Sequence, residues 1–502
     1  MEHNFFWEKL PAPRAYKRGG RFERSLGIAH SFYLRNKKTI IPIALFLTLT
    51  FIYIMLHLTF INQRAHYINV ADGDEPGYLM VTDSLVKDHD LSPLNNYLQL
   101  DYLKLGFYQQ QMKYPENRPM LIYGTGGRMV YSNARLLPFL LYPGFALFGY
   151  FGAVLTISLL MSGGALLTYL IARRFCRNWI SLLATLSFFL TYPAIAYSRR
   201  VYPEPAALFF LTLALWASLR LKESGNPSYA LLAGICASLL FQFHLKFAPL
   251  VLPLFYLAWL TSKRKKIEFP LWIAPVIISL GFALLWTKFL FGGGTIQGLT
   301  KTVSPENLGG APFWGFIGLY LDRGLGLLPF APLYLIFIPG LPLPRDRHEL
   351  NKWWCFIPAC IIVHTLSMGW FGQWHGGASP VPRYLIPLIP ILALCASFFL
   401  EKLRNFRIWC VVLFLLCLEV VLSIFAFIYP LETFGVSWHK NRLLPIVFGK
   451  WFGNFIASLF PTFHPLKFSS GILPLIIWLL LMIFGSIYLR KKEMGYFYER
   501  LT

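Results

Sequence analysis

Three carboxylates lie within four positions shortly after the first long apolar run, in the sequence DGDEPGY at positions 72–78. Ionised carboxylates beside a bilayer are costly unless they face water, pair with cations or act on a substrate. Pro76 suits the opening of a helix, which would place Asp74 and Glu75 near its positive amino end. A helix cap needs only one carboxylate. The group is therefore also a candidate for a general base that takes the proton of an acceptor hydroxyl.

A second carboxylate, Glu204, stands in the short turn Tyr202-Pro203-Glu204-Pro205, which follows Arg199-Arg200. The prolines on both sides stiffen the turn, and a stiff turn suits a group whose position must be fixed. Two interpretations stay open. Glu204 either forms an ion pair that ties its own turn, or it belongs to an active site.

His244 and Lys246 are nearly the only polar residues at the tip between two apolar runs, in the sequence FHLKF at 243–247. A lysine at the end of a membrane helix usually snorkels to the lipid headgroups. The alternative is that both cations bind a phosphate, whose departure as a leaving group requires charge neutralisation.

Two later loops combine glycine or proline with aromatic residues and a single cation, around Asp322-Arg323-Gly324 and from Trp374-His375 to Arg383-Tyr384. This composition suits a sugar stacked on an aromatic face. It equally suits an aromatic belt with a snorkelling arginine.

Metal-ligand spacing is poor, because the chain has no His-Glu-x-x-His and no Cys-x-x-Cys motif. Asp72, Asp74, Glu75 and Glu204 could coordinate a hard divalent ion only if they converge in space. No cofactor is certain, and dependence on a divalent metal ion stays open.

The elements that must position these residues are membrane helices. The 502 residues are 56% hydrophobic and only 14% charged, and the mean hydropathy is +0.52. Soluble domains rarely reach these values. The formal net charge of +23 is spread over short segments between the apolar runs. This is the distribution of the positive-inside rule and not that of a nucleic-acid-binding surface.

The pattern predicts an all-α polytopic membrane bundle with about twelve spans. We place them at 39–60, 150–172, 178–197, 205–221, 228–243, 245–261, 270–291, 326–341, 353–369, 384–400, 408–429 and 471–489. The run 135–149 is expected to be re-entrant or interfacial. Residues 1–38 and 490–502 then form basic cytoplasmic segments around a membrane domain, 39–489. The first external loop, 61–134, is expected to form short helices parallel to the membrane.

The same topology places Asp74, Glu204, Lys246 and Arg383 on the external face, since basic connections alternate with the others. We expect these four groups to converge in one cavity.

Three motifs together resemble the GT-C integral membrane glycosyltransferases. They are Asp74-Glu75 with Tyr78, the turn Tyr202-Pro203-Glu204, and the late sequence PRYLIP at 382–387. Within this superfamily the chain is most similar to the branch of protein O-mannosyltransferases and aminoarabinose transferases. The likeness extends over most of the chain in architecture but reaches motif level only in these three places.

The resemblance implies a hexosyl- or pentosyltransferase whose donor is a sugar on a polyprenyl phosphate. Asp74 best matches the catalytic base, Glu75 lies beside it, and Asp72 is the alternative. Glu204 resembles the acidic position of the second loop. The expected substrate-binding residues are Glu204, His244, Lys246, Arg383, Tyr384 and Tyr78.

The reaction that the resemblance implies is a direct, inverting displacement at the anomeric carbon on the external or periplasmic face of the cytoplasmic (inner) membrane. The expected partners are the lipid-linked sugar, membrane lipids, and a lipid, glycan or protein acceptor that offers a hydroxyl. No nucleic acid is expected.

Two other classes stay open. A transporter or lipid flippase also has many spans and buried polar groups, but its ionisable residues are expected at mid-span, where this chain has Glu419. A non-catalytic assembly subunit would tolerate neutralisation of every loop carboxylate.

Overall fold

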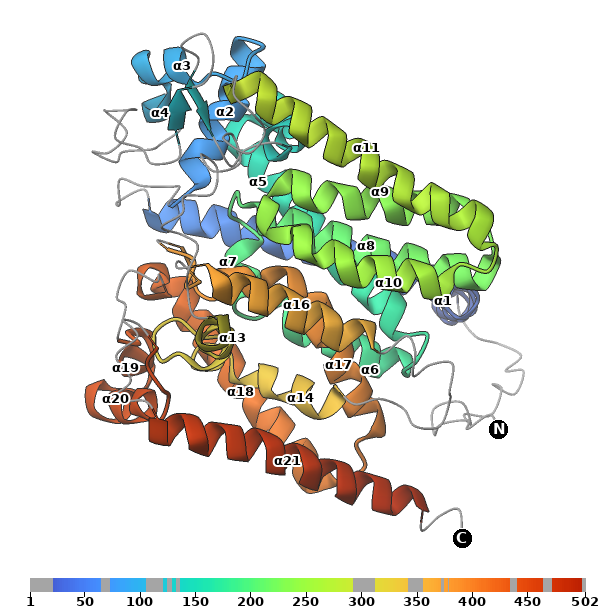
Figure 1. The fold of residues 1–502 in the computed structure, drawn as a ribbon. Coiled ribbons are helices and arrows are strands. Elements are labelled where there is room, and N and C mark those ends of the chain that lie inside the picture. The colour runs from blue at the N-terminus through green and yellow to red at the C-terminus, as the bar shows by residue number, and fades with distance from the viewer. Residues whose placement is uncertain are drawn as a thin grey trace.

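The protein is an almost entirely helical bundle (Figure 1). The computed structural model describes residues 21–64, 73–104, 121–123, 129–131, 136–291, 312–341, 355–371, 374–377, 379–433, 440–463 and 472–498. Asp72 and most of the loop between 105 and 135 lie outside these residues, as do residues 1–20 and 499–502.

Within the described residues, six helices are long and apolar enough to cross a membrane. Four of them are α5 (Leu137–Ala172), α8 (Pro203–Ser224), α11 (Lys265–Phe291) and α18 (Phe406–Ile428), and two further spans cover Thr39–Phe60 in α1 (Arg21–Arg64) and Arg383–Lys402 in η7 and α17. Shorter apolar helices cover Asn178–Phe189, Ser228–Phe243, Leu245–Thr261, Phe356–Trp370 and Leu473–Gly485. The prediction of an all-α multi-pass membrane protein is therefore confirmed.

The remaining helices are short or contribute to these spans. Their bounds are α2 (Glu75–Lys87), α3 (Leu94–Leu98), α4 (Asp101–Lys104), α6 (Asn178–Phe189), α7 (Ala194–Tyr197), α9 (Ser228–Phe243), η4 (Leu245–Leu250), α10 (Val251–Thr261), α13 (Pro312–Leu321), η6 (Pro332–Ile336), α14 (Phe337–Gly340), α16 (Phe356–Trp370), η7 (Arg383–Leu388), α17 (Ile389–Lys402), η8 (Pro430–Thr433), α19 (Leu443–Phe448), α20 (Lys450–Ser458) and α21 (Ile472–Tyr498).

The predicted span 326–341 is not a continuous helix. It consists of turns followed by the short helices η6 and α14. Pro329, Pro332 and Pro339 explain the difference, because a proline in a helix interior removes a hydrogen bond and clashes with the preceding turn. The backbone N–H of Leu333 donates instead to the carboxylate of Glu419 on α18 (3.4 Å). The mid-span acid thus supplies an acceptor for an irregular segment, which apolar surroundings require.

Within the predicted run 135–149, the residues from Leu137 onward belong to α5, and a sharp kink at Gly149 (φ 58°, ψ −140°) separates them from the rest of that helix. Glycine adopts positive φ without steric cost. The two limbs fold so closely together that a Cβ on Gly152 would lie 1.8 Å from the carbonyl oxygen of Gly144. The part of α5 before Gly149 is therefore not collinear with the span that begins at residue 150.

Small residues set how closely the spans approach one another. A Cβ on Gly234 of α9 would lie 2.2 Å from the carbonyl oxygen of Trp272 on α11. Such close backbone approach is typical of helix contacts in membranes. α9 also packs against α8, and α8 packs against α5 and η7. The core of the bundle brings the start of α8 next to the start of η7.

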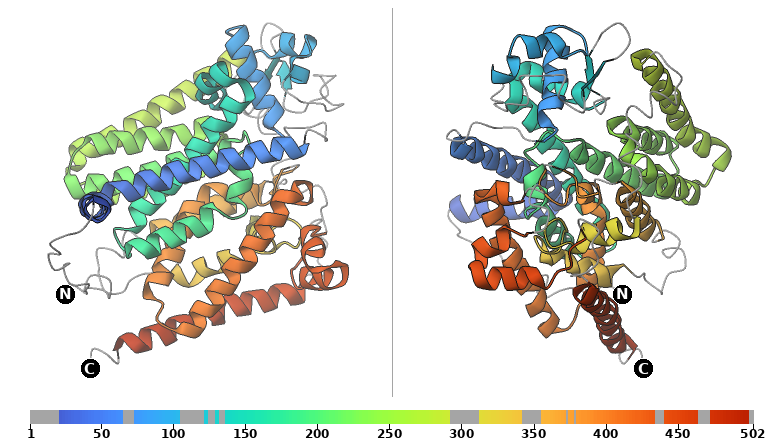
Figure 2. Two further views of the ribbon diagram at one scale, coloured as in Figure 1. Left: turned by 180° about the vertical axis from the view of Figure 1, so that it is seen from behind. Right: turned by 60° about the vertical axis from the view of Figure 1, so that its left-hand side comes forward.

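The described residues between α1 and α5 form a small cap at one end of the bundle, made of α2, α3, α4 and a hairpin (Figure 2). The hairpin pairs β1 (Leu121–Tyr123) with β2 (Met129–Tyr131) in antiparallel register, Leu121 opposite Tyr131. The short helices were expected, and the hairpin was not. Because α2 packs on α5, the acidic segment at the start of α2 is held against the bundle.

Candidate functional site

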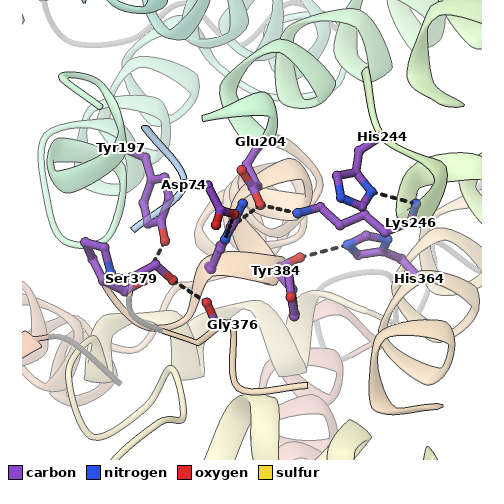
Figure 3. A network of polar contacts seen from close by, with 11 residues as sticks. Asp74, Tyr197, Glu204, His244, Lys246, His364, Gly376, Ser379 and Tyr384 are labelled. Atoms are coloured by element: carbon purple, nitrogen blue, oxygen red, sulfur yellow. Dashed lines mark hydrogen bonds and ion pairs between the residues drawn. The ribbon is translucent and has the colours of Figure 1, made fainter. Parts of the chain in front are cut away.

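Four charged side chains from four distant segments meet in one buried network (Figure 3). Asp74 immediately precedes α2, Glu204 lies in the first turn of α8, Lys246 lies in η4, and Arg383 opens η7. The sequence predicted that these four groups converge, and the structure brings them together.

Arg383 is the centre of this network. Its Nη1 lies 2.6 Å from Oδ2 of Asp74, and its Nε donates to Oε1 of Glu204 at 2.5 Å. The Nζ of Lys246 also donates to Oε1 of Glu204, at 2.5 Å. The fork of a guanidinium is suited to bridging two carboxylates in this way. The two acids and two cations balance one another, which is required when charges are buried.

Glu204 pairs with groups far away in the chain, so its role is not a local tie of the turn that carries it. Lys246 follows it by 42 residues and Arg383 by 179 residues. The Glu204 side chain is completely buried, and its second oxygen, Oε2, has no hydrogen-bond partner among the residues that the structure describes. Lys246 is also buried, and the expectation that it snorkels to the headgroups is therefore wrong.

Asp74 occupies the N-cap position of α2 but makes no capping hydrogen bond through its side chain. Its carboxylate binds Arg383 instead, and the side chain is 21% exposed, against 0% for Glu204. Asp74 is thus the acid of the network that a second molecule can reach. This geometry favours a chemical role over the capping interpretation.

Glu75 is turned away from this network toward the backbone that leads into α8. Its Oε1 accepts the N–H of Val201 (2.6 Å), and its Oε2 lies 3.2 Å from Nη1 of Arg200. The side chain is completely buried. Because both oxygens bind protein groups, Glu75 is suited to holding the start of α2 against the segment before Glu204.

Aromatic rings cover the two cations. The guanidinium of Arg383 lies 4.4 Å from the ring centroid of Tyr202, and Nζ of Lys246 lies 4.7 Å from that of Tyr384. A cation over an aromatic face is attracted by its quadrupole. Tyr78 on α2 is fully buried, and burial, reinforced by the charge of Asp74, raises the pKa of its hydroxyl. Tyr78 therefore stays protonated and can only donate or accept a hydrogen bond.

Two histidines hold the backbone of residues that belong to the network or lie next to it. The predicted phosphate ligand His244 accepts the backbone N–H of Lys246 on its Nδ1 (3.2 Å) and so caps η4. His364 of α16 forms a hydrogen bond between its Nε2 and the carbonyl oxygen of Tyr384 (2.8 Å). Its ring stacks on Phe247, with 6.2 Å between centroids. His364 was missed, because a lone histidine within an apolar run carries no motif.

Side-chain donors also hold the backbone that leads to Arg383. Tyr197 donates to the carbonyl oxygen of Pro380 (2.5 Å), and the hydroxyl of Tyr192 donates to that of Val381. Gly376 has a φ of 86°, and a Cβ there would lie 3.0 Å from the Cβ of Arg383. The segment can therefore place the arginine only with glycine at this position.

The Asp322 loop is a separate structure. Its carboxylate accepts backbone N–H groups from Gly324 (2.9 Å), Leu325 (3.0 Å) and Phe463 (2.7 Å). Burial raises the pKa of Asp322 to about 6. This acid ties two loops together and is not joined to the network around Arg383.

A metal ion finds no ready ligand set in the part of the chain that the structure describes, since no group of three His, Cys, Asp or Glu side chains is placed to hold one. Asp74, Glu75 and Glu204 each bind a cationic side chain. Asp72 lies outside the described residues.

A multi-pass helical bundle with this carboxylate and cation network at one end fits the class of GT-C integral membrane glycosyltransferases that the sequence resembles. The family described as dolichyl-phosphate-mannose-protein mannosyltransferase matches residues 122–286, about a third of the chain. The predicted resemblance is therefore confirmed. The matched segment contains Glu204, His244 and Lys246, whereas Asp74 and Arg383 lie on either side of it.

Among solved structures, the chain is similar to ArnT from Cupriavidus metallidurans bound to undecaprenyl phosphate. The two share 12% identity over 92% of this chain and 76% of that chain, with a TM-score of 0.49. No protein of curated function matches the chain.

Proposed function

We propose that this protein is a membrane glycosyltransferase that moves a sugar from a polyprenyl-phosphate donor to an acceptor hydroxyl. The observation that carries the proposal is the network in which Arg383 joins the partly exposed carboxylate of Asp74 to the buried pair of Glu204 and Lys246. It combines a base with cations for a departing phosphate, the two requirements of such a transfer.

In the proposed reaction Asp74 takes the proton of the acceptor hydroxyl. The acceptor oxygen forms a bond to the anomeric carbon while the bond from that carbon to the phosphate oxygen breaks. The lipid phosphate leaves with the bonding electron pair. Because the displacement is direct, the anomeric configuration inverts.

Lys246 neutralises the departing phosphate in this proposal. Its Nζ lies 2.5 Å from Glu204, so the phosphate competes with that carboxylate for the ammonium group. His244 holds the backbone of Lys246, and Tyr384 lies beside the ammonium. These contacts fix the cation in place before the donor arrives, which lowers the cost of binding.

The nature of the donor is supported by the family match, because that family is named for mannosyl transfer from dolichyl phosphate. We take the acceptor to be a lipid, a glycan or a protein that offers a hydroxyl. The alternation of basic connections supports an external site in the cytoplasmic membrane with both termini in the cytoplasm.

The decisive test replaces the base. In proteoliposomes supplied with lipid-linked sugar and acceptor, Asp74→Asn should abolish transfer while the protein keeps its elution profile and melting temperature. Asp88→Asn is the matched control, because Asp88 is an exposed carboxylate at the other end of the same helix, and it should retain wild-type turnover. Normal turnover by the Asp74 variant would exclude Asp74 as the base.

A further inference from the structure

Helix α20 has three different faces, although it is only nine residues long. Gly453 and Ala457 face the protein and are buried. Of the rest, Lys450, Asn454 and Ser458 form an exposed polar stripe at intervals of four residues. A second exposed stripe is aromatic and apolar, and consists of Trp451, Phe452, Phe455 and Leu459.

The aromatic stripe is a continuous surface and not a set of scattered side chains. Trp451 is 83% exposed, and its ring stacks on Phe455 with 6.4 Å between centroids and 11° between planes. Phe452 also stacks on Phe455, with 6.3 Å between centroids. Clustered exposed aromatics of this kind mark an interaction surface.

This surface is held rigidly. A Cβ on Gly453 would lie 2.4 Å from the carbonyl oxygen of Leu444, so α20 packs directly on α19. The guanidinium of Arg323 donates to the carbonyl oxygen of Phe460 (3.2 Å), just after the helix. The indole of Trp478 on α21 donates to that of Leu459 (2.9 Å).

The position of α20 in the bundle indicates what covers the aromatic stripe. α20 lies beside the beginning of α21, at the same end of the bundle as α2 to α4 (Figure 1). α21 exposes a row of large apolar side chains, among them Leu473, Ile477, Leu480 and Phe484. A span with such a surface faces lipid. The aromatic stripe therefore continues the lipid-facing surface at the point where the bilayer meets water.

We propose that α20 lies in the membrane interface, with its aromatic stripe inserted into the headgroup and acyl boundary of the leaflet on the side of the candidate site. The polar stripe then faces water, and the exposed cations Lys440, Arg442 and Lys450 lie at the level of the lipid phosphates. Interfacial helices are buried about 5–10 Å into this boundary, and tryptophan prefers this depth.

A protein partner is less compatible with this arrangement, because a partner that covered the whole exposed side would bury the polar stripe together with the aromatic one. The lipid interface provides an apolar and an aqueous environment side by side, as the two stripes require. The proposal concerns the membrane fold and does not depend on the proposed function.

The test places a photo-crosslinker on each stripe of the full-length protein. Benzoylphenylalanine replaces Phe455 in one variant and Asn454 in the other, in nanodiscs of phosphatidylcholine and phosphatidylglycerol. After irradiation, the variant at 455 should form phospholipid adducts, detected by mass spectrometry, in at least about tenfold greater yield than the variant at 454. Equal yields from both positions, or adducts of 455 with a second protein chain, would overturn the proposal.

Lipid quenching of tryptophan fluorescence provides a second measurement. The wild-type protein and the Trp451→Phe variant are compared in nanodiscs whose lipids are brominated at a shallow or at a deep acyl position. The component lost in the variant should be quenched more by shallow bromines than by deep ones. A lost component that neither bromine position quenches would place Trp451 outside the bilayer and refute the insertion.

Discussion

Replacing Arg383 with lysine tests whether this residue positions the base or binds the phosphate. Its two nitrogens reach Asp74 at 2.6 Å and Glu204 at 2.5 Å. A lysine ammonium is a single point of charge, so it can retain one of the two carboxylates but cannot bridge them with the geometry of the guanidinium. The charge of the site is preserved, and only the bridge is lost.

The expected loss of transition-state stabilisation in Arg383→Lys is that of one charge-assisted hydrogen bond in a buried site, about 1.5–3 kcal/mol. At about 1.4 kcal/mol for each factor of ten, this corresponds to a decrease of roughly 10- to 150-fold in kcat/KM. Because the misplaced group would be the base, we expect the decrease in kcat, with little change in the KM for the lipid-linked donor. Arg383→Ala removes the whole buried cation and should reduce stability as well, by about 3–5 kcal/mol.

The assay is initial-rate transfer in proteoliposomes with the lipid-linked donor varied at saturating acceptor. Arg442→Lys is the matched control, since Arg442 is 58% exposed and lies 3.8 Å from Glu432, an arrangement worth little energy. It should behave as the wild type. An unchanged kcat/KM in Arg383→Lys would refute the bridging role, and an effect confined to KM would identify Arg383 as a ligand of the donor phosphate.

Three further outcomes are expected. Lys246→Met should raise the KM for the lipid-linked donor at least about tenfold, because the remaining cation, Arg383, is already shared between Asp74 and Glu204 and cannot replace the ammonium group at the phosphate. Unchanged apparent affinity and rate would show that Lys246 does not bind the phosphate. His364→Leu should lower kcat about tenfold, because it removes the hydrogen bond to the carbonyl oxygen of Tyr384, a loss of about 1–1.5 kcal/mol. His364→Gln can donate to the same oxygen and should recover most of the lost kcat. Equal defects in the two variants would indicate that only the packing of the histidine ring matters. The pKa of Asp322 is raised to about 6 from 3.8, so its protonated form is favoured in the folded state, and its contribution to stability is greatest below pH 4 and declines as the pH rises through 6. Melting curves of the wild type and Asp322→Asn from pH 4 to 8 should therefore diverge over this interval, by at most about 3 kcal/mol, whereas parallel curves would contradict the shift.

Much of the bundle could be predicted from hydropathy alone. Eleven of the twelve predicted spans overlap an apolar helix in the described residues, although α6 ends at Phe189, inside the predicted span 178–197. The exception, 326–341, is as apolar as the others, and only its three prolines signalled the break. Hydropathy indicates that a segment lies in apolar surroundings, whereas its prolines determine whether the backbone can form a continuous helix there.

The members of the network could be predicted, but their pairing could not. Asp74, Glu204, Lys246 and Arg383 were singled out because each is a charge at the edge of an apolar run, and charges in such places are costly. Sequence proximity suggested that Glu204 pairs with Arg199 or Arg200. In the structure Glu204 pairs with Lys246 and Arg383, and Arg200 pairs with Glu75. Pairing depends on which helix ends meet in the fold, and the type and spacing of residues along the chain do not reveal that.

No motif or spacing in the sequence predicted the side chains that hold the backbone around Arg383. His364, Tyr192 and Tyr197 act by donating to backbone carbonyl oxygens of the segment around Arg383. Any buried histidine or tyrosine can do this, so residue type and spacing do not reveal it. The need for glycine at position 376 could not be predicted either, because it arises only from the close approach of the Arg383 side chain in the fold.

The spread of the network along the chain has a consequence for how the protein is made. During insertion into the membrane, Asp74, Glu204 and Lys246 are synthesised first, and Arg383 arrives 179 residues after Glu204. Until then the nascent chain holds two carboxylates and one of their two cations. The guanidinium that joins them is the last of the four groups to be synthesised, so the network cannot form before the chain has been made as far as the start of η7. A truncated chain that ends before residue 383 inserts most of its spans but leaves Asp74 without the cation that holds it.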